Sequence, residues 1–163
     1  MKKIFLMAAI VYSVAANSQV TKASLQASGL TCSMCSNAIN KALMTLEFVD
    51  KIDPNIKTST FEITFKPNAK VDFEKLKNKV ENAGFSVADF RATMQFNNVK
   101  IKDNETVIVG DKKLRFVNTK EQIINGAKTI KIIDKGFVSS KEFKKNAVPS
   151  TDPKSEKIFH VTI

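Results

Sequence analysis

Short segments in which apolar and polar residues alternate predict the β-strands in the first half of the chain. Residues 22–28 and 60–65 alternate strictly, with apolar residues on one side and polar residues on the other. A period of two is typical of a strand with one buried face. Residues 48–52 and 85–91 are candidates for two further strands, and the D-P-N sequence at residues 53–55 predicts a turn after the first of them.

Two other segments repeat apolar residues every three or four positions, which is typical of helices that bury one face. The first helix is expected from Cys35 onward, after a loop at residues 29–33. Its apolar stripe consists of Ile39, Ala42, Leu43 and Leu46. The second helix is expected between Asp72, a good N-cap residue, and Gly84, which suits the left-handed position after a helix. Its stripe consists of Phe73, Leu76, Val80 and Ala83.

These elements give residues 19–91 the order β-α-β-β-α-β. That order predicts a ferredoxin-like fold, in which two helices cover one face of a four-stranded antiparallel sheet. About 70 residues are enough to bury one modest core. The fold class expected for the whole chain is α+β, with this domain first.

The pattern changes in residues 92–163, where short β-type runs are separated by turn signals. The runs lie at residues 94–96, 99–101, 106–109, 114–117, 129–133 and 157–163. Turn signals include N-N at 97–98 and N-G at 125–126. Ser139 and Glu142 have the spacing of a capping box, which predicts a short helix through Lys145. The second half is therefore expected to form a separate, small β-rich domain, a barrel or a sandwich, and its pattern indicates no role.

The first 18 residues have the organisation of a secretory signal peptide. Two lysines at positions 2 and 3 precede an apolar stretch of about 13 residues, which is too short to span a membrane. The sequence A-N-S at residues 16–18 then provides the small residues of a cleavage site. We therefore expect an exported protein, in a bacterial periplasm or outside the cell, with no transmembrane segment after removal of the signal.

Composition excludes several classes of protein. The 163 residues carry a formal net charge of +10, but only two cysteines and one histidine. This number of ligands excludes a four-ligand zinc finger, an iron–sulfur cluster and a disulfide-dense scaffold. Lysines alternate with acidic and apolar residues, so no nucleic-acid partner is expected. No catalytic constellation is present, so we expect no enzyme, and we assign His160 to packing or to the surface.

Cys32 and Cys35 are the candidate functional residues, because they lie where the first strand meets the first helix. Two intervening residues allow both sulfurs to turn toward one point, and the N-terminal end of a helix favours the thiolate form. A pair of soft thiolates suits a soft monovalent ion, above all Cu(I). With only two ligands such a site stays open to solvent, and a thiolate from another protein could attack the metal there.

The sequence G-L-T-C-S-M-C at residues 29–35, together with E-N-A-G-F at residues 81–85, resembles the heavy-metal-associated domain family. The resemblance covers residues 21–91. It implies a metallochaperone-like domain that binds one ion through Cys32 and Cys35, preferentially Cu(I), with Zn(II) or another soft metal as alternatives. It also implies a metal-donor or metal-acceptor protein as partner. Leu30 occupies the position of the apolar plug, which is methionine in most copper carriers, and Phe85 that of the residue shielding the loop.

Two alternatives to metal binding stay open at this point. In an oxidising compartment, the same cysteines could act as a thiol–disulfide pair. The domain could also be an interaction module whose cysteines contribute nothing. Met34, between the cysteines, could lend a thioether to Cu(I), but we interpret it as an exposed or loop-packing side chain rather than a ligand.

Overall fold

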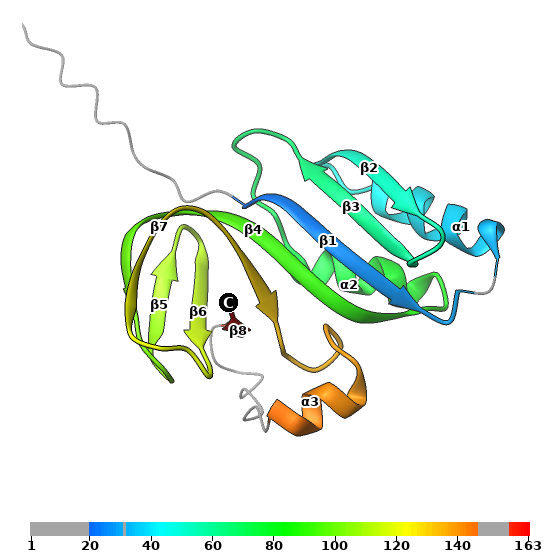
Figure 1. Ribbon diagram of the computed structural model, residues 1–163. Helices are drawn as coiled ribbons and strands as arrows, with labels where there is room; N and C mark the ends of the chain where they lie inside the picture. Colours follow the sequence, from blue (N-terminus) through cyan, green and yellow to red (C-terminus); the bar gives the residue numbers. More distant parts are fainter. Residues whose placement is uncertain (1–19, 31, 147–156) are drawn as a thin grey trace, which may run out of the picture.

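In the computed structural model, which describes residues 20–30, 32–146 and 157–163, eight strands form a single sheet. The predicted signal peptide lies outside these residues. The strands are β1 (Val20–Ser28), β2 (Val49–Asn55), β3 (Thr60–Phe65), β4 (Ser86–Ile101), β5 (Thr106–Val109), β6 (Lys112–Phe116), β7 (Gln122–Ile132) and β8 (Ile158–Thr162). Their order across the sheet is β2-β3-β1-β4-β7-β8-β6-β5, and only the β6–β8 pair is parallel among the described strands (Figure 1).

The first half has the predicted ferredoxin-like arrangement. Helices α1 (Ser33–Met44) and α2 (Phe73–Asn82) pack beside each other against one face of the sheet formed by β2, β3, β1 and β4 (Figure 1). The Asp72 carboxylate accepts a hydrogen bond from the Lys75 backbone N–H at 3.1 Å, which confirms the predicted N-cap. The predicted left-handed residue after the helix is also confirmed, since Gly84 has a φ of 90°.

Two predicted boundaries in this half were wrong. Helix α1 begins at Ser33 rather than Cys35, so its first turn already contains the second cysteine. Strand β2 continues through Pro54, where the sequence indicated a turn. Because β2 is the edge strand, a proline without an N–H donor is tolerated on its unpaired side.

The largest correction concerns β4 and β7, which are long strands that pair with each other. The predicted strands 94–96 and 99–101 lie within β4, and the predicted strand 85–91 is its first part from Ser86 onward. The residues of the predicted turns at 97–98 and 125–126 lie inside strands. They lie opposite each other where the register of the β4–β7 pairing shifts, between Phe96 and Val99. The Asn98 backbone N–H donates to Asn125 Oδ1 at 3.3 Å across this irregularity. These residues therefore form a β-bulge, although their sequence alone is typical of hairpin turns.

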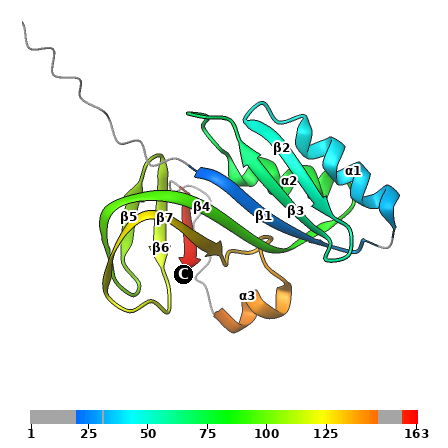
Figure 2. The same cartoon turned by 45° about the horizontal axis from the view of Figure 1, so that its top comes forward.

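The two halves of the chain share one sheet and one hydrophobic cluster. The boundary predicted between residues 91 and 92 falls inside β4, and a separate barrel or sandwich is not confirmed. Figure 2 shows β4 running from the α/β half into the strands of the second half. Four fully or largely buried rings join the halves, with Phe73 against Phe90 and Phe159 at 5.3 Å, and Phe137 against Phe90 at 5.5 Å. The division into two domains stays a prediction.

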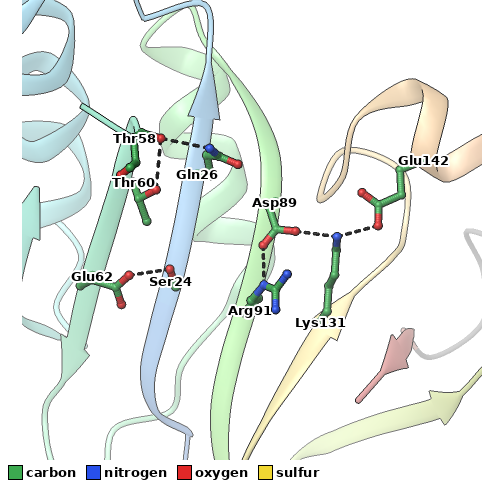
Figure 3. Close-up of polar contacts among 9 residues, drawn as sticks. All are labelled: Ser24, Gln26, Thr58, Thr60, Glu62, Asp89, Arg91, Lys131 and Glu142. Atoms are coloured by element: carbon green, nitrogen blue, oxygen red, sulfur yellow. Dashed lines mark hydrogen bonds and ion pairs between the residues drawn. The ribbon is translucent and has the colours of Figure 1, made fainter. Parts of the chain in front are cut away.

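Ion pairs connect helix α3 (Ser140–Asn146) to the sheet. Figure 3 shows Lys131 between Asp89 and Glu142, with its ammonium group 2.6 Å from a carboxylate oxygen of each. Burial lowers the pKa of the Lys131 ammonium, but the two carboxylates outweigh that effect and hold its pKa above the ordinary value. The Glu142 backbone N–H donates a hydrogen bond to Ser139 Oγ at 3.3 Å, which confirms Ser139 as the predicted cap of this helix.

His160 is a buried packing residue with a specific partner. Its Nδ1 lies 2.8 Å from Asp134 Oδ1, and its backbone N–H donates to Asp134 Oδ2 at 2.9 Å. Its Nε2 is buried and has no hydrogen-bond partner among the residues that the structure describes. One carboxylate thus holds β8 against the loop that follows β7.

Replacing Asp134 by alanine is expected to lower the free energy of unfolding by about 2–4 kcal/mol, because a buried imidazole and a buried N–H would lose their acceptor. Urea unfolding measures this loss. The midpoint concentration of urea should fall, while the m-value should stay the same. The matched control is Asp53→Ala, which breaks an exposed ion pair with Lys51 and is expected to cost under about 0.5 kcal/mol. Equal shifts in the two variants would contradict the structural role of Asp134.

Candidate metal centre

The candidate centre begins where β1 turns toward α1. Gly29 follows the last residue of β1 and has a φ of 85°, a left-handed conformation that favours glycine. Cys32, the N-cap residue of α1, follows three positions later. Thr31 lies outside the described residues.

Cys32 and Cys35 lie at the N-terminal end of α1, as the sequence predicts. Cys32 is the N-cap residue, with an extended backbone, and its side chain makes no capping hydrogen bond. Its carbonyl oxygen accepts a hydrogen bond from the Ser36 backbone N–H at 3.4 Å, which begins the helix. Cys32 is exposed, Cys35 is half-buried, and their Sγ atoms lie 3.0 Å apart. A disulfide requires about 2.05 Å, so the two thiols are within hydrogen-bond distance and do not form a disulfide.

The electrostatic setting of the pair is simple. The first turn of α1 contains no acidic residue, so no carboxylate there offsets the partial positive charge of the helix N-terminus. Inward-facing Ser36, Ile39 and Leu43 are buried and hold the helix against the sheet. The cysteines therefore lie on a fixed helix end whose partial positive charge is not offset by a carboxylate in the first turn.

Leu30 and Phe85 both lie next to the segment between β1 and α1, on the side of the core. Leu30 is half-buried and packs against the hydrophobic cluster. A Cβ built on Gly29 would lie 3.9 Å from Phe85 Cδ1, so the aromatic ring covers the turn before the loop. The Phe85 backbone N–H donates to the Val80 carbonyl at 3.2 Å, which fixes this residue at the end of α2. These contacts suit the support and shield that the resemblance implies.

The described residues bring no further strong ligand to the cysteines. No group of three or more His, Cys, Asp or Glu side chains with metal-binding geometry occurs in the part of the chain that the structure describes. Met34, which the sequence analysis interpreted as an exposed or loop-packing side chain, is 80% exposed and does not pack in the core. An arrangement of this kind can hold one soft ion through two sulfurs, or can close into a disulfide.

Comparison with known proteins gives the same assignment for the first half. The model of the heavy-metal-associated domain matches residues 24–86. A mercuric transport protein periplasmic component from Pseudomonas aeruginosa is 35% identical over 88 residues, which are 52% of this chain and 93% of that protein. A probable copper-exporting P-type ATPase from Archaeoglobus fulgidus is 34% identical over 70 residues, which are 43% of this chain but only 9% of the ATPase.

One solved structure is also similar to part of the chain. A crystal structure of oxidized MerP from Ralstonia metallidurans CH34 is 32% identical, covers 42% of this chain and 97% of its own, and gives a TM-score of 0.38. The family match and the nearly complete coverage of the mercuric transport protein lead to one conclusion. This chain belongs to the heavy-metal-associated domain family.

Proposed function

We propose that this protein binds one soft metal ion, Cu(I) in the first place, through Cys32 and Cys35, and exchanges it with another protein. The observation that carries the proposal is the pair of sulfurs 3.0 Å apart at an accessible helix N-terminus, in a member of the heavy-metal-associated domain family. The ion is cargo, so the proposal includes no catalytic step and no enzyme activity.

The chemistry of the ligands supports a soft ion. Two thiolates favour Cu(I) over harder divalent ions, whereas a structural Zn(II) site uses four ligands. The relatives include proteins named for copper export and for mercuric transport, so Hg(II) is a second candidate of the same softness. With one face of the ion left open, an incoming thiolate could bind before either cysteine releases the metal. Transfer to an acceptor protein would then proceed through a shared intermediate.

The proposed location is the periplasm or the outside of the cell. Two observations support it, the signal-like residues 1–18 and the relative named as a periplasmic component. Among the described helices, none has the length and hydrophobicity needed to cross a membrane. In such a compartment the protein would carry or sequester the ion before a membrane transporter or another carrier takes it.

A thiol–disulfide function is the second candidate, and the same distance favours it. Sulfurs 3.0 Å apart, with one of them exposed, need little movement to form a disulfide. The two functions also exclude each other at any moment, since an oxidised pair has no thiolate to offer a metal.

An anaerobic competition titration of the reduced protein separates these functions. We expect one equivalent of Cu(I) to be withdrawn from a chromophoric chelator, and slow or no reduction of a test disulfide in the same buffer. Reduction of the test disulfide without Cu(I) uptake would instead assign the thiol–disulfide function. A protein that does neither would be an interaction module, and the metal-binding proposal would be wrong.

A further inference from the structure

The side chain of Met34 is exposed to solvent and does not stabilise the fold by packing in the core. Its side chain is 80% exposed, the highest exposure of any large apolar side chain in the described residues. Met44, on the same helix, is 46% exposed, and Met94 is fully buried. An exposed single apolar residue is ordinary by itself, but Met34 lies in the first turn of α1, between the two candidate ligands.

The separation of the cysteine sulfurs restricts the geometry that an ion could adopt there. With metal–sulfur bonds of about 2.3 Å, two sulfurs lie about 4.6 Å apart around a linear ion and about 4.0 Å apart around a trigonal one. The observed separation is 3.0 Å. Around a four-coordinate ion the two sulfurs would lie about 3.8 Å apart. A trigonal or four-coordinate ion therefore requires less opening of the cysteine pair than a linear ion, and both require a ligand beyond the two cysteines.

The residues around the cysteines offer few candidates for that third ligand. The described part of the chain places no histidine or carboxylate in a three-ligand group with the two sulfurs. Ser33, the other residue between the cysteines, has only a hydroxyl group, which is a hard donor. Met34 has a thioether, which is a soft donor that suits Cu(I). Its unbranched side chain has three rotatable bonds, and its exposure leaves these bonds unconstrained.

We infer that Met34 supplies a third, thioether ligand to the ion held by Cys32 and Cys35, and that it determines selectivity for Cu(I) over Zn(II). This inference rests on the proposed function and deepens it. A neutral thioether adds a soft ligand without adding charge, so it stabilises Cu(I) while leaving Zn(II) little changed. Because the thioether is weaker than a thiolate, an acceptor's cysteine would displace it first. Met34 would thus also mark the side from which the partner approaches.

The test compares Met34→Leu with Met44→Leu, a matched control on the same helix that removes a sulfur far from the cysteines. We expect Met34→Leu to lower the Cu(I) affinity by about tenfold or more, the usual effect of losing a supporting group at a metal site. Zn(II) affinity should change by less than about twofold in both variants, because Zn(II) is a harder ion than Cu(I) and binds a thioether weakly. In reduced protein with 13C-labelled methionine methyl groups, one equivalent of Cu(I) should shift the Met34 signal and leave the Met44 signal in place.

Each outcome bears on one of the two proposals. An unmoved Met34 methyl signal, with wild-type Cu(I) affinity in Met34→Leu, would overturn the role of Met34 and leave binding by the two cysteines intact. Equal losses in Met34→Leu and Met44→Leu would also overturn it, because they would reflect a general effect on α1. Failure of the unchanged protein to bind Cu(I) at all would overturn the proposed function itself.

Discussion

Replacing either Cys32 or Cys35 by serine is expected to lower the Cu(I) affinity by at least about a thousandfold, equivalent to about 4 kcal/mol. Serine has nearly the same size as cysteine, but its hydroxyl group is a hard donor that stays protonated at neutral pH. The single remaining thiolate cannot chelate, so the ion loses both a strong bond and the advantage of two ligands on one helix end. Anaerobic competition against chelators of graded affinity measures the effect.

The fold should survive both cysteine replacements. Cys32 is exposed and Cys35 is half-buried, and neither side chain belongs to the hydrophobic cluster. We expect the free energy of unfolding to change by less than about 1 kcal/mol, as for most positions outside a core. Ser33→Ala, between the two cysteines, is the matched control and should keep the Cu(I) affinity of the unchanged protein. Retention of tight Cu(I) binding by either serine variant would remove that cysteine from the proposed site.

Ending the chain at Arg91 is expected to lower the free energy of unfolding of the ferredoxin-like half by about 3–5 kcal/mol. Rings Phe73 and Phe90 are fully buried in the whole chain, and both contact rings contributed by the second half. The fragment would also lose β7 as the neighbour of β4 and thereby expose the backbone groups of a strand that is internal in the whole chain. A loss of this size is a large part of the stability of a small domain.

Urea unfolding followed by circular dichroism compares residues 19–91 with residues 19–163. Within the longer chain, Phe137→Ala should reproduce part of the loss, since this ring packs on Phe90 and receives the Lys77 ammonium over its face at 5.3 Å. Ile123→Ala is the control from the second half, because its side chain is 68% exposed. A fragment that unfolds at the same urea concentration as the longer chain would instead establish residues 19–91 as an independent domain.

The second half also contributes charges to the first half, which the truncation would remove. Lys157, next to β8, lies 2.8 Å from Glu74 Oε1 in the first turn of α2. Lys112 in β6 is buried, with its ammonium 5.4 Å from the centre of the Phe73 ring and 2.8 Å from Asp111 Oδ2. The start of α2 is therefore surrounded by residues from beyond position 91, and it should be the first element to lose order in the fragment.

Local patterns in the sequence determined the elements of the first half and the position of the cysteines. Strict alternation over residues 60–65 predicted the bounds of β3 correctly. With a period of two, the apolar residues can all face the core only in one register. Asp72 and Gly84 marked the ends of α2 through capping chemistry that depends on neighbours within one turn. The spacing of Cys32 and Cys35 before an apolar stripe likewise placed both sulfurs at a helix start.

Tertiary structure alone decided the features that depend on residues far apart in the chain. The turn signals at 97–98 and 125–126 became a bulge only because β4 and β7 pair there, and Pro54 fits β2 only because no strand pairs with its outer side. The bond between Asp134 and His160 and the ring cluster shared by both halves have no local signature, since their members approach only when the sheet forms. Periodicity reports which side of an element is buried, whereas long-range pairing determines what covers it.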